Sequence, residues 1–547
     1  MDPKKIKDTL FLPKTDFPLK NTNHSEVEKK IRELWDEKRI YQQVLEKNKN
    51  NPNFILHSGP PYANGKIHLG HVLNFLIKDI IVRFQASAGY YTPFLLGWDA
   101  HGLPIEHKML QTYKDKKVDL RSLCHQFALE QSQIQREQLK KLGLFTDYDK
   151  YYITLDKKYE AEQIRIFAEM VRKNLVYRGW KPIYWSCSHA TALAEAEVEY
   201  LEKKDTSLYF KIYSTEISRF FNKENVGLLV WTTQPWTIPA NELVAIKKDA
   251  HYVLVECNGE HLIILEKMSE ILKSWGYSLK IKKIFLGEEI LGFHYTHPYR
   301  NNDELSYIVD GGEFIRENEG TGIVHLAPAF GTEDFNLAKK EKVISEISCS
   351  LEPNGYFNEK IKVLEFIGKH YTEVNNSVIV DLEKRNLIMK KKEIIHSYPH
   401  DWRDKSPLIY RLTEQWFINI QTIKPDLLKN IEKAKWHPYW TKEKMKQAIK
   451  NREDWCISRQ RKWGVPIPVL YKQGEPILNA EIINYIADLI AEHGSDCWFD
   501  DTILPFLHEK FPFPYLNMAE LGKDTMDVWL DSGVSHWCVL QKDKTIR

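Results

Sequence analysis

The sequence predicts an α/β protein whose main domain is interrupted by a β-rich insert. Residues 54–57 and 91–96 are apolar runs, and between them residues 68–84 place apolar side chains at helical spacing. This strand, helix, strand order is typical of an α/β domain. From 205 to 392 the pattern changes to short runs rich in β-branched residues, separated by Gly, Pro and Asn. Because the α/β pattern then returns, an insertion is the simplest account.

The chain is longer than one core usually organises, so several units are expected. We predict a helix over residues 24–41 and a mostly helical stretch over 108–177. Strands are predicted in the insert at 207–213, 227–231, 252–256, 262–265 and 323–326. The predicted division is an N-terminal helical segment (1–48), the first half of the α/β domain (49–204), the insert (205–392) and the second half (393–547).

Composition limits the function classes. The formal net charge is only +2, so any nucleic-acid binding must come from local basic patches. Seven cysteines occur without a C-x-x-C pair, which argues against a disulfide framework and favours the reducing cytoplasm. No apolar run is long enough for a transmembrane helix. These observations predict a cytoplasmic chain with no membrane partner.

The stretch GPPYANGKIHLGH, from Gly59 to His71, lies between a predicted strand and a predicted helix. It is not a P-loop, because the glycine spacing is wrong and Ile67 follows Lys66 where a hydroxyl should bind magnesium. His68 and His71 would instead lie beside the N-terminus of the helix, a position that favours anions. Each imidazole can donate to a phosphate oxygen.

Asp99 follows the second predicted strand, and ligands of α/β domains bind beyond such strand ends. For each of these residues an ordinary structural role is the alternative. The two histidines could cap a helix, Asp99 could cap a turn, and Trp529 could belong to the core. Thr232 and Thr233 could be ordinary strand threonines.

Several motifs, in order, resemble the class I aminoacyl-tRNA synthetases, and within them the isoleucine branch. They are His68-Leu69-Gly70-His71, the preceding Gly59–Gly65 segment, Gly97-Trp98-Asp99 with His101–Glu106, Asp454–Arg461, and Asp527–Gly533. The resemblance implies a Rossmann-like catalytic domain split by an editing domain. It also implies that His68, Gly70 and His71 are catalytic, and that Gly59, Pro60, Asp99 and Trp529 bind the amino acid.

The reaction implied by the resemblance is ligation of L-isoleucine to tRNA(Ile) in two steps. The amino acid's carboxylate attacks the α-phosphate of ATP, which is accompanied by Mg²⁺, and the aminoacyl group then passes to the 3′ ribose of the tRNA. Such catalysis rests on positioning and charge stabilisation and needs no protein nucleophile. A monomer is expected.

The insert resembles the editing domain of the same family. The matching segments are Trp231–Asn241, Gly320–His325 and Asp334, and they imply an editing site of Thr232, Thr233, Asn241, His325 and Asp334. Editing is needed because a missing methylene in an apolar pocket changes binding by only about 1–3 kcal/mol, a magnitude known from enzymes of this family. Valine therefore enters too often, and a second hydrolytic site removes it.

The sequence departs from the family in three places. Gln234 stands where a third threonine is usual. Some relatives bind zinc through cysteine pairs, whereas the corresponding segments here are Cys187-Ser188-His189 and Asp401-Trp402-Arg403-Asp404, so we predict no zinc. The second ATP motif of the family is expected beyond Arg547, which suggests a fragment of a longer enzyme.

Two other functions are kept open. The chain could be a stand-alone editing hydrolase or an inactive synthetase fragment. A P-loop NTPase is a further alternative, disfavoured by the glycine spacing.

Overall fold

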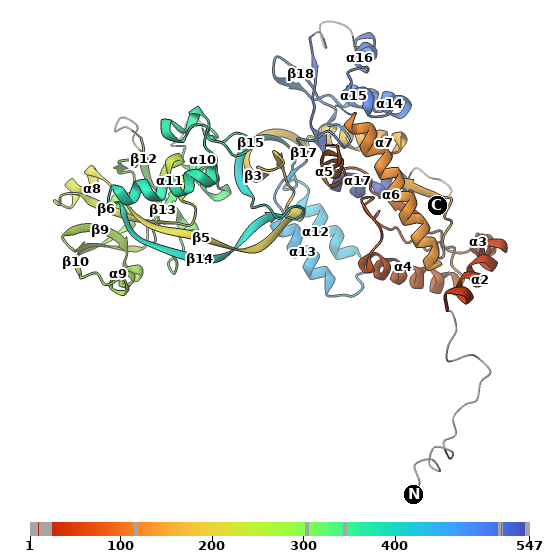
Figure 1. Cartoon of the computed structure of the whole chain (residues 1–547), viewed down its shortest axis with the longest axis horizontal. Coiled ribbons are helices and arrows are strands. Elements are labelled where there is room, and N and C mark those ends of the chain that lie inside the picture. Colours follow the sequence, from red (N-terminus) through yellow and green to blue (C-terminus); the bar gives the residue numbers. More distant parts are fainter. Residues whose placement is uncertain are drawn as a thin grey trace.

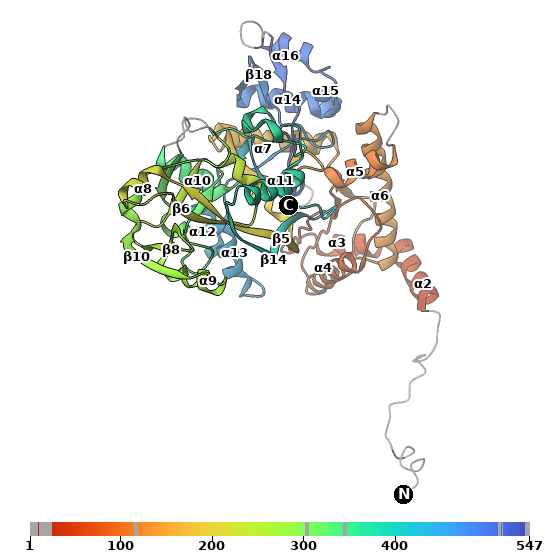
Figure 2. The ribbon, with the colours of Figure 1, turned by 60° about the vertical axis from the view of Figure 1, so that its left-hand side comes forward.

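A computed structural model describes residues 9, 24–113, 119–300, 306–342, 347–511, 516 and 518–541. Figure 1 shows two bodies joined by a long pair of antiparallel strands, β5 (Val198–Tyr213) and β14 (Ile388–Asp401). One body holds the elements between these strands, and the other holds the remaining elements. In Figure 2, turned by 60°, the insert comes forward and overlaps part of the other body. The expected interruption of an α/β body by a β-rich unit is therefore present in the fold.

The N-terminal helix predicted over residues 24–41 is instead two helices, α2 (His24–Glu37) and α3 (Ile40–Asn48). Arg39 separates them with a left-handed backbone, at φ +47°. The turn allows Tyr41 to contact Phe145 edge-on and to accept a hydrogen bond from the backbone N–H of Phe94. Tertiary packing thus overrides the continuous helical pattern of the sequence.

The two predicted strands at 54–57 and 91–96 are extended but mostly unpaired. The chain forms single parallel bridges at Asn53–Tyr91 and Tyr62–Asp99, and a regular strand, β1 (Leu96–Trp98), only begins at the end of the second run. It pairs in parallel with β2 (Tyr151–Ile153). Prolines at 52, 60, 61 and 93 lack the N–H that a ladder needs, which explains the short pairing.

Helices surround this small parallel pair. The predicted helix after the glycine-rich stretch is confirmed as α4 (Leu69–Ser87). The helical prediction for residues 108–177 is largely confirmed, apart from β2 and the start of β3 (Val176–Ser186), and its residues 114–118 lie outside the described part of the chain. The helices are α5 (Leu103–Thr112), α6 (Leu120–Leu142) and α7 (Lys157–Arg172). Apolar faces of α7 and of α14 (Ala480–His493) form one large core.

The β-rich unit is built on a ten-stranded sheet, and all five predicted strands are found within it. Its apolar core also includes residues from outside the insert, among them Trp185, Ile409 and Leu412. Its remaining strands are β6 (Val226–Thr232), β7 (Leu243–Ile246), β8 (His251–Cys257), β9 (Glu260–Leu265), β10 (Leu279–Leu286), β11 (His294–Tyr295), β12 (Ser306–Asp310) and β13 (Val324–Leu326). Its helices are α8 (Thr215–Phe220), α9 (Glu270–Ser274), α10 (Thr332–Glu341) and α11 (Tyr371–Lys384).

An antiparallel sheet lies where the two bodies meet. Its order is β16 (Trp455–Cys456), β15 (Ile409–Ile418), β3 (Val176–Ser186) and β4 (Thr191–Ala192). Between the paired strands β15 and β16 the chain makes an excursion, the helical hairpin α12 (Lys424–Lys433) and α13 (Thr441–Asn451). In Figure 1 this hairpin lies between the insert and α4.

The last part of the chain packs back onto the α/β body. Strand β17 (Ser458–Arg459) pairs with β21 (Thr525–Met526), and β18 (Leu470–Lys472) pairs with both β19 (Glu475–Ile477) and β20 (Glu520–Leu521). Helices α15 (Asp496–Phe499), α16 (Leu504–Lys510) and α17 (Val528–Gly533) complete this part. Within the described residues, the helices are too short or too polar to cross a bilayer.

Candidate functional site

The two predicted phosphate-binding histidines lie together at the start of α4. His68 is the N-cap, and its Nδ1 accepts a hydrogen bond from Gly70 N at 3.1 Å, while His71 Nδ1 accepts from His68 N at 3.3 Å. The rings stack with centroids 3.9 Å apart. Burial and the neighbouring His68 lower the pKa of His71, so its ring is neutral at pH 7. Because each Nδ1 is an acceptor here, each Nε2–H remains as a donor toward solvent.

Gly70 is required by this arrangement, since a Cβ at position 70 would lie 2.9 Å from Cε1 of His68. The glycine-rich segment before it is fixed from α6. Gln135 Nε2 donates to the carbonyls of Tyr62 and Gly65, and Gln138 Oε1 accepts from Ile67 N. The backbone that leads to both histidines is therefore held by partly buried hydrogen bonds from α6.

Asp99 belongs to the same small framework. Its backbone N–H donates to Pro61 O, and its carbonyl accepts from Ala63 N, so the glycine-rich stretch and the end of β1 are paired directly. The side chain is buried, with Thr154 Oγ1 3.5 Å from its Oδ1, and it also accepts a hydrogen bond from the backbone of His101. Burial, reinforced by the charge of Asp531, raises the pKa of Asp99 well above its usual range. Such a carboxylate favours a cationic ligand.

The His101 imidazole lies between two buried carboxylates, those of Asp531 and Glu160. Its Nδ1 lies 2.6 Å from Oδ2 of Asp531, and its Nε2 lies 3.2 Å from Oε1 of Glu160. Burial alone would lower the pKa of His101, but these two carboxylates outweigh it and raise the pKa to about 10. Gln163 Nε2 donates to the other oxygen of Asp531. Asp531 is thereby paired directly, whereas the ionised form of Asp99 is stabilised by the charge and backbone of His101 and by Thr154, which do not outweigh its burial.

The other predicted substrate residues lie at the surface of this region. Gly59 is exposed with open space around its Cα, and Pro60 is half-buried. Trp529 projects from α17 with 48% of its surface exposed, so the structure does not place it in the core. The start of α17 approaches the Tyr62 hydroxyl, because a Cβ at Gly102 would meet both Tyr62 and Val528.

A buried network of charges joins α17 to the strands that lead into the insert. Arg459 bridges Asp527, at 2.8 Å, and Glu197, at 3.5 Å, and Arg403 also pairs with Glu197. Burial raises the pKa of Glu197, but Arg459, Arg403 and Arg461 outweigh that effect and lower it to about 2. Glu197 precedes β5 and Arg403 follows β14, so both ends of the insert are tied to the predicted amino-acid site.

In the insert, two predicted residues, Thr232 and His325, meet at one end of the sheet together with Thr237. His325 on β13 places Nε2 3.2 Å from Oγ1 of Thr232 and 3.3 Å from Oγ1 of Thr237. Burial lowers the pKa of His325 to about 4, so its imidazole is neutral at pH 7. Thr233 is half-buried in the turn that follows β6. The sequence analysis named Thr232 and Thr233 but passed over Thr237.

Asp334 lies in the first turn of α10, next to the end of β13. Its Oδ2 accepts a hydrogen bond from Ala327 N at 2.8 Å, and burial raises its pKa to about 6. Asn241 is deeper. Its amide nitrogen donates to the carbonyls of Leu243 and Leu326, and its oxygen accepts from the Tyr295 hydroxyl. The amide nitrogen and oxygen therefore both make hydrogen bonds within the protein, so Asn241 supports the site without facing a ligand.

Comparison with known proteins decides the family. Residues 30–546 match the family described as tRNA synthetases class I (I, L, M and V). The chain belongs to this family. It is 41% identical over 543 residues to the isoleucine–tRNA ligase of Geobacillus thermodenitrificans (strain NG80-2), covering 98% of this chain and 58% of that protein. It is also 41% identical over 551 residues to the isoleucine–tRNA ligase of Geobacillus kaustophilus (strain HTA426), covering 99% and 59%.

The class I synthetase chain thus spans somewhat less than three fifths of the length of these curated relatives. Among solved structures, the ternary complex of Agrobacterium radiobacter K84 agnB2 LeuRS, tRNA and LeuAMS aligns with 96% of this chain and 60% of that chain. The TM-score is 0.41 and the sequence identity 18%. The fold class predicted from the sequence, a class I synthetase fold, is confirmed by the family match.

The synthetase's candidate metal ligands come together only in part. Atoms of His189, Asp401 and Asp404 lie within 4.8 Å of one another, at the base of the insert. Cys187 lies apart from them, close to Gly355 and His370. The donor set is therefore an imidazole and two carboxylates, unlike the cysteine pairs of zinc-binding relatives. The absence of zinc stays a prediction.

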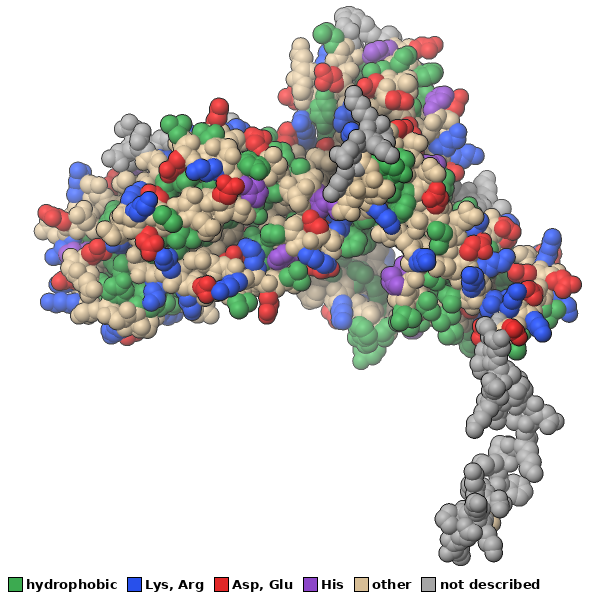
Figure 3. All heavy atoms as spheres, in the orientation of Figure 1, with side chains coloured by type: hydrophobic (Ala, Val, Ile, Leu, Met, Phe, Trp, Pro, Cys, Tyr) green, Lys and Arg blue, Asp and Glu red, His purple; other side chains and the backbone are tan. Residues whose placement is uncertain are grey.

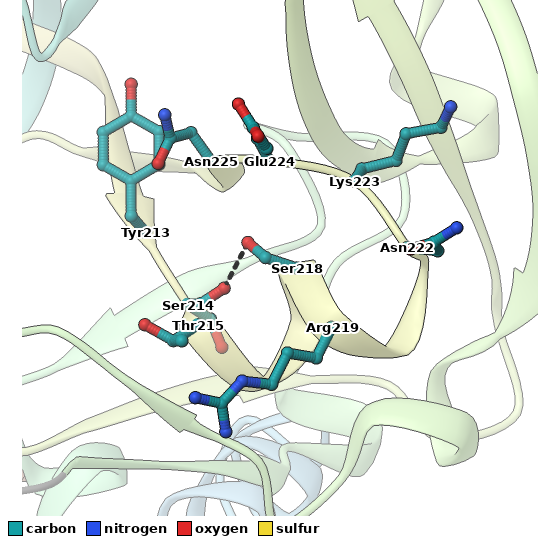
Figure 4. Close-up of a pocket in the computed structure, with 9 residues that line it drawn as sticks. All are labelled: Tyr213, Ser214, Thr215, Ser218, Arg219, Asn222, Lys223, Glu224 and Asn225. Carbon is teal, nitrogen blue, oxygen red and sulfur yellow. Dashed lines mark hydrogen bonds between the residues drawn. The ribbon is translucent and has the colours of Figure 1, made fainter.

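A surface cavity of about 520 Å³ occurs elsewhere in the synthetase, around α8 of the insert. Figure 4 shows the residues that line it, among them Ser214 and Ser218, with the Ser218 hydroxyl donating to the Ser214 carbonyl. None of the predicted site residues lines this cavity. It lies outside both candidate sites.

The sequence analysis did not assign roles to His101, Glu160, Asp531 and Glu197. The first three converge from segments far apart in the chain, so their contacts depend on tertiary structure. A usable signal did exist for two of them, because His101 and Asp531 fall inside the motifs that carried the family resemblance.

Proposed function

We propose that the protein containing this chain is an isoleucine–tRNA ligase, which activates L-isoleucine with ATP and transfers it to tRNA(Ile). The observation that supports this most directly is the pairing of the Gly59–His71 segment with Asp99. It puts donors for phosphate and an acceptor for ammonium on one framework. An amino acid and ATP are ligands that this pair of groups would bind together.

His68 and His71 donate to the phosphates as charge shifts during adenylate formation, and Gly70 allows the His68 ring to approach the backbone. Asp99 binds the ammonium group of the amino acid. Trp529, Pro60 and Gly59 form the walls of the side-chain pocket. Mg²⁺ enters with ATP as part of the substrate. The protein acts as a cytoplasmic monomer.

We further propose that residues 205–392 form an editing domain that hydrolyses valine from mischarged tRNA(Ile). Asp334 would hold the ammonium of the valyl group. The hydroxyls of Thr232 and Thr233 and the neutral imidazole of His325 would position the ester and the attacking water. Asn241 contributes by fixing the backbone between β7 and β13.

The decisive experiment is exchange of labelled pyrophosphate into ATP by the complete gene product, with isoleucine, valine or leucine added. We expect exchange to depend on isoleucine most strongly, on valine weakly and on leucine hardly at all. Asp99→Ala should abolish it, whereas Asp149→Ala, an exposed carboxylate outside the proposed site, should not. Preference for another amino acid, or hydrolysis of ATP without any amino acid, would reject the proposal.

Editing is tested separately by release of labelled valine from valyl-tRNA(Ile). We expect release by the wild-type protein and a large loss in Asp334→Ala, with synthesis of isoleucyl-adenylate retained. If exchange failed while valine release persisted, the protein would be an editing hydrolase and not a ligase.

A further inference from the structure

The helical hairpin α12–α13 has a composition unlike the rest of the chain. Residues 424–450 contain eight lysines and three acidic residues, whereas the whole chain has 77 basic and 75 acidic residues. A net charge of +2 for the whole chain therefore does not exclude a local basic patch that attracts a polyanion, and this hairpin carries one. None of the roles proposed above uses this hairpin.

Several of its lysines are free to meet a ligand. Lys442 and Lys446 are held by Glu432, at 2.5 and 2.8 Å, and Lys424 donates to the carbonyl of Lys450. By contrast, Lys429, Lys433 and Lys435 are exposed, and they have no acidic partner among the residues that the structure describes. Lys429 and Lys433 are four residues apart on α12 and so lie on one face of the helix.

The turn of the hairpin presents aromatic rings to solvent. Tyr439 is 83% exposed and Trp440 is 50% exposed, which is far more than aromatic side chains of this size usually are. The turn is braced from within, because Trp436 Nε1 donates to Ile431 O at 2.9 Å and Thr441 Oγ1 donates to Pro438 O at 2.7 Å. Lys444 lies 4.7 Å from the centre of the Trp440 ring.

The position of the hairpin suits a ligand that reaches the insert. Its two ends contribute Gln421, Asn451 and Arg452 to a cavity of about 500 Å³, which is also lined by Thr332 and Glu333 of the helix that bears Asp334. In Figure 3 hydrophobic side chains gather at the lower edge of the molecule, where the hairpin and α4 lie in Figure 1. The hairpin therefore lies beside a cavity that the insert also lines.

We propose that the α12–α13 hairpin binds the single-stranded end of an RNA, with Lys429, Lys433 and Lys435 contacting phosphates and Tyr439 and Trp440 stacking on bases. Exposed rings beside unpaired lysines are the combination that single-stranded nucleic acids recognise, because every base has a face to stack and every nucleotide a charge. An acidic protein would use the lysines but leave the two rings in water. The proposal rests on the proposed function in that the RNA would be the tRNA substrate.

The test measures binding of a labelled RNA stem-loop with a single-stranded 3′ tail to the full chain, by fluorescence anisotropy over a range of salt concentrations. We expect Lys429→Gln/Lys433→Gln to reduce the slope of log affinity against log salt by about 1.4, since each contact to a single strand accounts for about 0.7. The matched control is Lys390→Gln/Lys392→Gln, which removes two exposed charges from β14 and should leave the slope unchanged.

Trp440→Ala tests the stacking. We expect it to weaken binding of the tailed RNA about tenfold, and to have no effect on the same stem-loop without its tail. Circular dichroism and thermal unfolding of each variant establish that the hairpin is folded. If a variant loses helix, Trp440→Phe, which keeps a stacking surface, should restore binding of the tailed RNA.

Two results would overturn the proposal. In one, the lysine and tryptophan variants bind the tailed RNA as tightly as wild type. In the other, polyglutamate competes as well as RNA and the tail makes no difference, which would make the hairpin a general polyanion surface. Pyrophosphate exchange with isoleucine requires no RNA, so the ligase proposal can succeed or fail independently of this test.

Discussion

His101 Nδ1 lies 2.6 Å from Asp531 Oδ2, and both side chains are almost completely buried. The pair joins the turn after β1 to helix α17, which bears Trp529. Glu160 contacts the other ring nitrogen, so a single imidazolium is shared between two carboxylates from different elements. The buried imidazolium of His101 therefore holds the geometry of the proposed amino-acid site. The proposed mechanism gives it no contact with the substrate.

Replacing His101 by Gln should destabilise the fold by about 3–5 kcal/mol at pH 7, because two buried carboxylates lose their counter-charge. The pKa of His101 is about 10 in the folded chain and about 6.5 when unfolded. Its stabilisation is therefore complete below pH 6.5 and is lost as the pH rises through 10. Urea unfolding of both proteins at pH 7 and pH 10 should show the difference shrinking. A difference independent of pH would mean that the ring is not cationic.

Asp99→Asn should weaken isoleucine binding by about 3 kcal/mol or more, since the buried ammonium of the ligand would lack its counter-charge. The raised pKa of Asp99 indicates that its ionised form is costly in the free protein, so the variant should also unfold at a higher temperature at neutral pH. Calorimetric titration with isoleucine and thermal unfolding check the two parts. Normal affinity of the variant for isoleucine would mean that Asp99 only caps a turn.

His71→Ala should slow adenylate formation by about 3 kcal/mol in activation free energy, with little change in the KM for isoleucine. A donor to phosphate acts mainly where charge shifts in the transition state. Pyrophosphate exchange at varied isoleucine concentration separates the two parameters. His125→Ala serves as a control, because this exposed histidine lies outside the proposed site.

Asp334→Asn should stabilise the folded chain above pH 6 by about 1–3 kcal/mol while reducing valine release. The pKa of Asp334 is raised to about 6, so the ionised carboxylate is unfavourable in the fold above that pH. The unfolded carboxylate titrates near 4. The advantage of the variant should therefore fall as the pH is lowered from 6 towards 4. Wild-type valine release should fall over the same range, as Asp334 takes up a proton.

Asn241→Ala is expected to act through stability. The variant removes the hydrogen bonds of Asn241 to the Leu243 and Leu326 carbonyls and to the Tyr295 hydroxyl. The Leu326 carbonyl still accepts from Glu242 N and Tyr295 still bonds Ser306, so we expect a total cost of about 1–3 kcal/mol. Urea unfolding measures this loss. The fraction of protein that remains folded should edit valine at close to the wild-type rate, and a full loss of editing in folded protein would place Asn241 in the reaction.

The fold could be predicted well where pattern and packing agree. The five strands predicted in the insert are apolar runs or alternate apolar and polar residues, and each was found where the sequence placed it, whereas the other five strands of its sheet were not predicted. The prediction was wrong for the strands at 54–57 and 91–96, where nearby prolines lack ladder donors, and for the N-terminal helix, which turns at Arg39. A local backbone constraint outweighed periodicity in the first case, and tertiary packing did so in the second.

For the candidate sites, the sequence identified side chains but not their neighbours. His68, His71 and Asp99 were named because their spacing within a motif places them at a helix start or a strand end. The pairing of His101 with Asp531 joins residues far apart in the chain, so no spacing rule could identify it. The same applies to Thr237, whose hydroxyl reaches His325 only because β6 and β13 are neighbours in the sheet.

The paired strands β5 and β14 carry the chain from the α/β body into the insert, which also contacts β15 directly through the hydrogen bond from Leu412 N to Ala329 O. Residues 198–207 pair with residues 392–401 before β5 meets β6, so this two-stranded ribbon is about 30 Å long. Since the ladder hydrogen bonds lie within the ribbon, it resists stretching but can twist and bend across its face. An insertion of one residue in a single strand would reverse which side chains face each way beyond it. The ribbon can therefore change length and keep its register only when both strands change together. Evolution can lengthen or shorten it only through matched changes in residues 198–207 and 392–401.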